Sequence, residues 1–266
     1  MAYPEYVGFE DIAGTLRSLG TLWIVSSIVV IMTLMGHLWP IYIAMLSHAE
    51  QPVEFWAVSL GAIGTMSTIF IIYVLARTIV LAKYTGDRKF SMGPGLIIAS
   101  LLVSMATGCL ALFLVIQQSV PRFPTLLFLL AMLAVIYFVV LVAGIILLGV
   151  AFYGMGEENH VPALSIGGIL LIFLPFVSQI LVGFGLRELA TSVEMWDSPS
   201  LEKEIAETLR SPKVPVMLRY LSRTKRIPML ALRLIIARLI ERGELFGRIE
   251  GGTYYPSWSL RSRIYA

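Results

Sequence analysis

The chain has 266 residues, of which 58% are hydrophobic and 14% are charged, and its mean hydropathy is +0.84. Soluble domains carry about 25% charged residues, so this composition excludes an ordinary soluble domain and indicates a membrane protein. The net charge of +3 hides an asymmetry, because residues 211–266 hold 11 Lys and Arg against 3 Asp and Glu. A basic segment of this kind predicts an anionic partner, either lipid headgroups, nucleic acid or an acidic protein.

Residues 19–190 predict a polytopic, mainly α-helical membrane bundle of about five spans, preceded by a separate segment at 1–18. Within residues 1–18, apolar side chains recur along one side of a helix, as expected of a short helix lying at the membrane surface. Residues 19–190 contain apolar stretches that each exceed the ~20 residues needed to cross a bilayer. The expected spans are 19–46, 55–81, 94–116, 124–152 and 161–186.

Two ionisable residues are candidates for mid-membrane depth, Arg77 and His37, and Arg77 is expected to reach the membrane surface from the end of its span. His37 and Pro175, together with Ser178 and Gln179 just after the proline, are the candidates for an intramembrane polar site or hinge. Small residues in the second span predict close helix packing at the pairs Gly61/Thr65 and Gly64/Thr68. The same packing is expected in later spans at Gly144, Gly149, Gly167 and Gly168.

The C-terminal residues change character, since 191–210 predict a linker with a short helix and 211–266 predict a small α+β domain. The elements expected in that domain are a helix at 214–223, an extended piece at 225–228, a helix at 229–242 and a hairpin of 245–250 with 253–255 across Gly251 and Gly252.

This order resembles a winged helix, and the run LIERGELFGRIEGGTYYP is similar to the winged helices of PCI and DDRGK proteins. The matching positions are Leu239, Ile240, Gly243, Leu245, Gly247, Ile249, Tyr254 and Tyr255. The resemblance implies a domain that serves either DNA binding or protein–protein assembly. The usual fold has one more helix before the recognition helix, but residues 224–228 leave no room for it, so that helix is predicted to be missing or merged.

The candidate surface for an anionic partner consists of arginines in and around the expected recognition helix, namely Arg226, Arg233, Arg238, Arg242 and Arg248. A helix that reads the DNA major groove presents Arg, Lys, Asn or Gln from its N-terminal half, where only Arg233 qualifies. The pattern therefore favours protein contact or docking at the membrane surface over nucleic-acid binding.

No pattern in the chain predicts catalysis, a metal site or a cofactor. Cys109 is the only cysteine, so it forms no internal disulfide, and the three histidines do not have the spacing of helical metal ligands. Nucleophile–base pairs, paired carboxylates and phosphate-binding loops are not recognisable. We therefore expect a protein that is not an enzyme.

The expected function is that of a multi-pass protein of the cell membrane, with a cytoplasmic winged helix acting as anchor, adaptor or assembly subunit. Its expected partners are membrane lipids and either another protein or a second copy. The alternatives are a membrane-tethered DNA-binding regulator and a small transporter or channel with a regulatory tail. One conflict remains, because five spans and a cytoplasmic C-terminus place the basic loop of Lys83, Arg88 and Lys89 outside, against the positive-inside rule.

Overall fold

The computed structural model describes residues 8–47, 53–116, 124–210, 214–250 and 252–257, without the side chains of 37–63, 111–127 and 130. The helices that we call the bundle are α1 (Phe9–Ser47), α2 (Val53–Thr78), α3 (Leu81–Thr85), α4 (Lys89–Ile116), α5 (Pro124–Asn159), α6 (Pro162–Phe173) and α7 (Pro175–Met195). The elements that we call the C-terminal domain are α8 (Pro199–Arg210), β1 (Val216–Met217), α9 (Leu218–Lys225), α10 (Met229–Glu241), β2 (Gly247–Glu250) and β3 (Thr253–Pro256).

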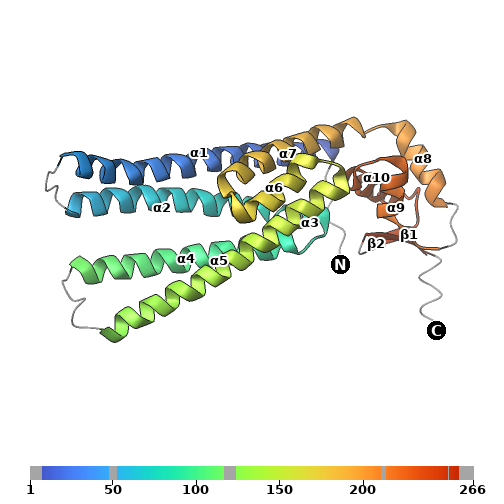
Figure 1. The fold of residues 1–266 in the computed structure, drawn as a ribbon. Coiled ribbons are helices and arrows are strands. Elements are labelled where there is room, and N and C mark those ends of the chain that lie inside the picture. Colours follow the sequence, from blue (N-terminus) through green and yellow to red (C-terminus); the bar gives the residue numbers. More distant parts are fainter. Residues whose placement is uncertain (1–7, 48–52, 117–123, 211–213, 251, 258–266) are drawn as a thin grey trace.

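The long helices of the bundle run alternately away from the C-terminal domain and back towards it (Figure 1). Four helical stretches of the described chain are long and apolar enough to cross a membrane: Phe9–Gly36, Gly64–Thr85, Lys89–Leu110 and Ala131–Asn159. Large apolar side chains point outward along them, as Phe128 and Val139 of α5 do at 63% and 61% exposure. Helices that are apolar on their outer faces suit a lipid environment, so the expected class of membrane protein is supported at this level.

The segment 161–186, expected as a fifth span, is not one helix but two. The backbone breaks at Leu174, and Pro175 then begins α7. Proline has no N–H to donate and disfavours helical geometry in the residue before it, which explains the break. A Cβ on Gly167 would touch Val182, and one on Gly185 would touch Leu164, so α6 and α7 lie antiparallel as a hairpin. We call this pair the α6–α7 hairpin.

The N-terminal segment also differs from the expectation, because residues 9–18 are the first turns of the 39-residue helix α1 rather than a separate helix. Phe9, Ile12 and Leu16 are each buried to 3% exposure or less. The apolar side of these turns therefore packs inside the protein, and Arg17 pairs with Glu194 near the end of α7.

Glycines let the helices of the bundle approach closely. A Cβ on Gly20 of α1 would lie 2.5 Å from the carbonyl oxygen of Gly183 in α7, which no real side chain tolerates. Gly144 of α5 packs in the same way against Gly93 of α4. Gly149, Gly167 and Gly168 also lie at close helix contacts, so the expectation that small residues pack these helices is confirmed at these positions.

The C-terminal domain is a three-stranded antiparallel sheet in the order β1-β3-β2, packed with three helices. The expected hairpin is confirmed, since Ile249 pairs with Tyr254 and Glu250 with Thr253 across the two-residue turn. The expected helix at 214–223 starts only at Leu218, because Val216 pairs with Tyr254 and so belongs to a strand. Buried side chains from α8, α9, α10 and the sheet form one core, in which Ile205, Leu221, Ile235 and Tyr254 take part.

Candidate functional site

Helix α10 faces the bundle, and its first turn is bonded to the last residue of α5. The first N–H groups of a helix have no partner within it, and Pro228, which precedes α10, has no side chain that could cap them. Asn159 supplies the cap from the bundle, because its Oδ1 accepts a hydrogen bond from the Leu230 N–H at 2.8 Å. The same amide donates to the carbonyl of Met155 at 2.7 Å, so this buried side chain is bonded on both sides.

Arg233, on the same helix, reaches from the C-terminal domain to the turn between α3 and α4. Its guanidinium donates a hydrogen bond to the carbonyl oxygen of Thr85, and its Nε is buried without a partner among the described residues. Burial lowers the pKa of the Arg233 guanidinium, and the nearby charges of Glu158 and Asp87 oppose that shift. The side chain expected to contact an anionic partner is thus used inside the protein.

Arg238 and Arg242 form an ionic cluster with α8 and with the chain before it. Arg238 bonds to Asp197 at 2.7 Å and to Glu202 at 2.6 Å, and Arg242 bonds to the other oxygen of Glu202 at 2.8 Å. The Arg238 guanidinium also lies 4.4 Å from the ring centroid of Phe9, a cation–π contact with the start of α1. These contacts hold α8, α10 and α1 together.

The remaining two candidate arginines are exposed, and they differ from each other. Arg248 on the wing pairs with Glu250 on the same strand at 2.9 Å. The backbone N–H of Arg226 donates to the carbonyl of Ser222 at the end of α9, but its guanidinium has no hydrogen bond or ion pair with any described residue. The five arginines therefore do not form one surface, because three bind within the protein, one pairs on the wing and only Arg226 stays available.

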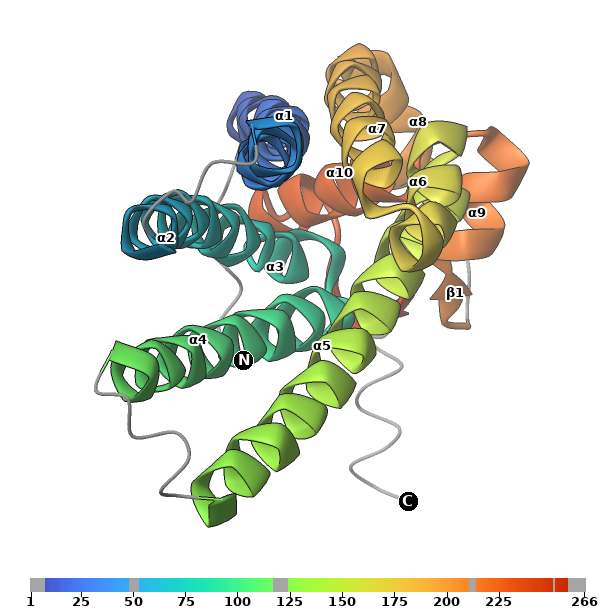
Figure 2. The same ribbon diagram turned by 60° about the vertical axis from the view of Figure 1, so that its left-hand side comes forward.

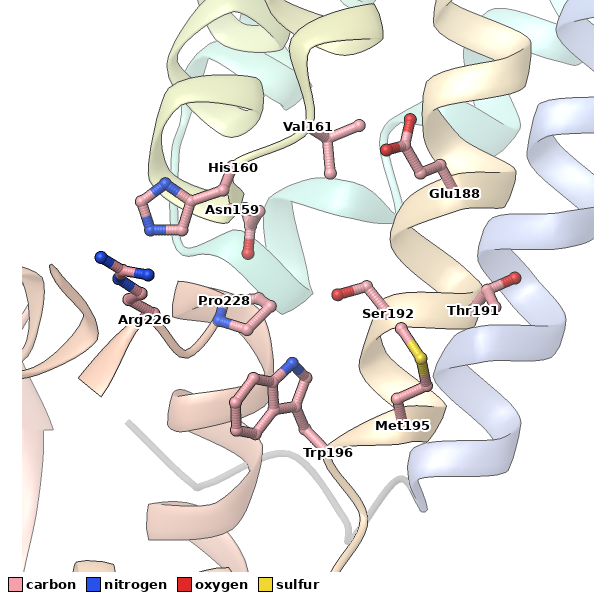
Figure 3. Close-up of a pocket in the computed structure, with 10 residues that line it drawn as sticks. All are labelled: Asn159, His160, Val161, Glu188, Thr191, Ser192, Met195, Trp196, Arg226 and Pro228. Atoms are coloured by element: carbon pink, nitrogen blue, oxygen red, sulfur yellow. The ribbon is translucent and has the colours of Figure 1, made fainter.

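Arg226 lines an open cavity of about 400 Å³ where the bundle meets the C-terminal domain. Figure 3 shows Arg226 and His160 on one side of this cavity, with Glu188 and Ser192 of α7 on the other. The lining residues are Asn159, His160, Val161, Glu188, Thr191, Ser192, Met195, Trp196, Arg226 and Pro228. We call it the junction cavity; it combines cationic, anionic and hydroxyl groups at the charged end of the bundle.

The candidates for an intramembrane polar site are used in helix packing where the structure describes them. Pro175 sits at the break of the α6–α7 hairpin, and Ser178 donates to the carbonyl oxygen of Gly167 across it at 2.6 Å. Gln179 accepts a hydrogen bond from Ser26 of α1 at 3.3 Å. The side chain of His37 lies outside the described residues.

The second-span candidates are only partly visible. Thr68 donates to the carbonyl of Gly64 one turn earlier in its own helix, and the neighbouring Ser67 bonds to Thr33 of α1. Thr65 is exposed, and Gly61 lies among the residues whose side chains are not described. The predicted close packing at these two pairs therefore stays a prediction.

Sequence reasoning missed the residues that join the bundle to the C-terminal domain. Asn159 and Thr85 carry contacts between these two parts, and Glu202 pairs α8 with α10 inside the C-terminal domain. Each is an ordinary loop or helix residue in the sequence. A signal did exist for Glu202, since an acid in the first turn of a short helix can pair with arginines on a neighbouring helix. Asn159 and Thr85 act through partners 71 and 148 residues away, which no local pattern indicates.

Within the described residues, no group of three or more His, Cys, Asp or Glu side chains is placed to hold a metal ion. Comparison with protein-family models, curated proteins and solved structures finds no match for this chain.

Proposed function

We propose that this chain is an integral protein of the cell membrane that holds a winged-helix domain at the cytoplasmic surface as an anchor, adaptor or assembly subunit. In this proposal the domain is fixed to the bundle through α10, and its opposite side binds a protein partner or a second copy. The observation that carries it is the use of α10, the expected recognition helix, as the contact to the bundle.

The order of elements supports a winged helix. Helix α8, strand β1, helices α9 and α10 and the β2–β3 hairpin follow one another, and β1 pairs with β3 in the sheet order β1-β3-β2. In this assignment α8 is the first helix of the winged helix. Helix α9 is then the helix before the recognition helix, which the sequence analysis expected to be missing or merged. The domain would then begin near Pro199 rather than at residue 211.

The α6–α7 hairpin supports a topology of four spans and one re-entrant hairpin. Helix α6 has 12 residues, which at 1.5 Å per residue is about 18 Å and too short to cross the ~30 Å hydrocarbon core. An even number of crossings places both ends of the chain on one side. The loop of Lys83, Arg88 and Lys89 then lies with the basic C-terminal domain on the cytoplasmic side, as the positive-inside rule requires.

The surface proposed for a protein partner lies in and beside β1, which is an edge strand of the sheet. Val214, Met217 and Tyr220 are 66%, 68% and 72% exposed, although all three are large and apolar. An exposed strand edge with apolar side chains is a template for pairing with another chain. We call these three residues the β1 edge patch.

The alternative of a DNA-binding regulator is less well supported. Groove reading needs side chains that project freely from the recognition helix, but Arg233 and Arg238 are engaged with Thr85 and Glu202. The alternative of a transporter has the α6–α7 hairpin in its favour, because discontinuous helices build many transporter sites. However, residues 162–186 contain no charged side chain that would mark a substrate path.

Purification from mild detergent tests the proposed function. We expect the full chain to retain a stoichiometric protein partner or to self-associate, and the triple variant Val214→Ser, Met217→Ser, Tyr220→Ser to lose it. The control variant Ile166→Ser changes an equally apolar, half-exposed residue on α6, away from the patch, and should keep the partner. A monomer without partners in both the unmodified chain and the control would contradict the proposal.

A further inference from the structure

We propose that the junction cavity binds a phosphate ester of the kind found in a phospholipid headgroup, with the Arg226 guanidinium as its main contact. The proposal goes beyond the anchoring function, because it assigns a small-molecule site between the bundle and the C-terminal domain. Its volume of about 400 Å³ lies within the range of small-ligand pockets.

The first argument is the free charge of Arg226. The side chains of Arg233, Arg238, Arg242 and Arg248 all bind groups within the protein, whereas the Arg226 guanidinium has no partner among the described residues. Figure 3 shows Arg226 and His160 at the same edge of the cavity, which both residues line. A guanidinium presents a fork of donors that matches phosphate oxygens, and an imidazole adds a further donor.

The second argument is the backbone of the same two residues. In the described chain, His160 and Arg226 are the two non-glycine residues with positive φ, at 58° and 56°. A side chain in this left-handed region costs about 1–2 kcal/mol, which glycine would avoid. Both residues end a helix and both line the same cavity, so the left-handed backbone sets where these two groups lie at its edge.

The opposite wall determines what else the ligand carries. Glu188 offers a carboxylate and Ser192 offers a hydroxyl, both from α7. A ligand with a phosphate at one end and an amine or hydroxyl at the other would satisfy both walls. Ethanolamine and glycerol phosphodiesters have this chemistry, and the amine form pairs best with the Glu188 carboxylate.

The position of the cavity indicates where the ligand comes from. Along α7 the exposed apolar Phe184 is followed by Arg187 and Glu188, so the cavity lies where the bundle surface changes from apolar to charged. Ile166 and Ile169 on α6, the helix that follows the lining residues His160 and Val161, are 51% and 49% exposed and provide an apolar surface for acyl chains. A headgroup at this level keeps its chains in the bilayer.

Native mass spectrometry of the full chain in detergent tests the proposal with four probes: phosphatidylethanolamine, phosphatidylglycerol, diacylglycerol and glycerophosphate. The test variant is Arg226→Gln, and the matched control is Arg223→Gln, an exposed arginine one turn earlier in α9 that does not line the cavity. We expect Arg226→Gln to weaken phospholipid binding about tenfold and Arg223→Gln to leave it unchanged. Glu188→Gln should weaken only the amine-bearing lipid.

The outcomes separate the two sources of phosphate. Binding of phospholipid but not of glycerophosphate, lost in Arg226→Gln, supports a membrane lipid; binding of both, lost together, supports a phosphate site that is also open to water. Equal binding by the two arginine variants, or diacylglycerol binding as tightly as the phospholipids, would overturn the proposal. The variant Arg226→Lys, which keeps the charge, should retain most of the binding and shows that a loss in Arg226→Gln is not misfolding.

Discussion

At the scale of single residues, the junction between bundle and C-terminal domain depends on a few buried polar side chains that bond across it. Asn159 is 4% exposed and bonds both to Met155 in its own helix and to Leu230 at the start of α10. A buried group of this kind contributes most through the penalty that follows when its partner is left unsatisfied.

We predict that Asn159→Ala lowers the free energy of unfolding by about 1–3 kcal/mol, because the Leu230 N–H would lose its partner in a buried site. Thermal unfolding of the purified variant and of the unmodified chain in detergent measures this loss of stability. Thr224→Ala is the control, since that exposed hydroxyl bonds only within its own helix and its loss should change little. If the unfolding temperature of Asn159→Ala equals that of the control, the hydrogen bond from the Leu230 N–H to Asn159 does not stabilise the protein.

The two glutamates of α8 that form ion pairs should differ in how much they stabilise the protein. Glu202→Ala leaves Arg238 and Arg242 without their shared carboxylate in a site where the Glu202 side chain is only 9% exposed, and we expect a loss of about 3 kcal/mol. Glu204→Ala removes the partner of Lys225 on the surface and should cost less than ~1 kcal/mol. Denaturant unfolding of both variants checks the ranking, and equal losses would be inconsistent with it.

At the scale of elements, glycine contacts determine how closely the helices of the bundle approach one another. We predict that Gly20→Ala destabilises the bundle, because its Cβ would meet the carbonyl of Gly183 in α7. Gly14→Ala in the same helix is the matched control, since its Cβ would meet nothing within 4 Å and alanine favours the helix by about 1 kcal/mol. Melting temperatures in detergent should therefore move in opposite directions, and a shared direction would argue against the close approach of α1 and α7.

The sequence predicted the elements better than their arrangement. Apolar length indicated the long helices, and the two-glycine turn indicated the β2–β3 hairpin, because both signals are local. The strand at Val216 was mistaken for helix, since it exists only through its pairing with Tyr254. Pro175 was recognised as a kink, but the complete reversal at Leu174 depends on Gly167 and Gly185 packing across the hairpin, which is a tertiary effect.

At the scale of the whole molecule, the hairpin decides the topology. We predict that a cysteine replacing Arg88, at the start of α4, and a cysteine added after Ala266 lie on the same side of the membrane. In a Cys109→Ala background, a membrane-impermeant maleimide should label both only after the cells are lysed. A fifth span would separate them, so that one cysteine is labelled on intact cells and the other only after lysis.

The central claim is that the C-terminal domain is docked on the bundle through the face that carries α10. Glu158 at the end of α5 pairs with Arg219 of α9, so cysteines at these two positions should be joined by a short bifunctional maleimide in native membranes. Glu241 lies 11 residues beyond Leu230, the contact of Asn159, which is about 16 Å further along α10. Our account predicts an intramolecular cross-link for Glu158→Cys with Arg219→Cys and none for Glu158→Cys with Glu241→Cys; equal yields, or no cross-link in either, would contradict it.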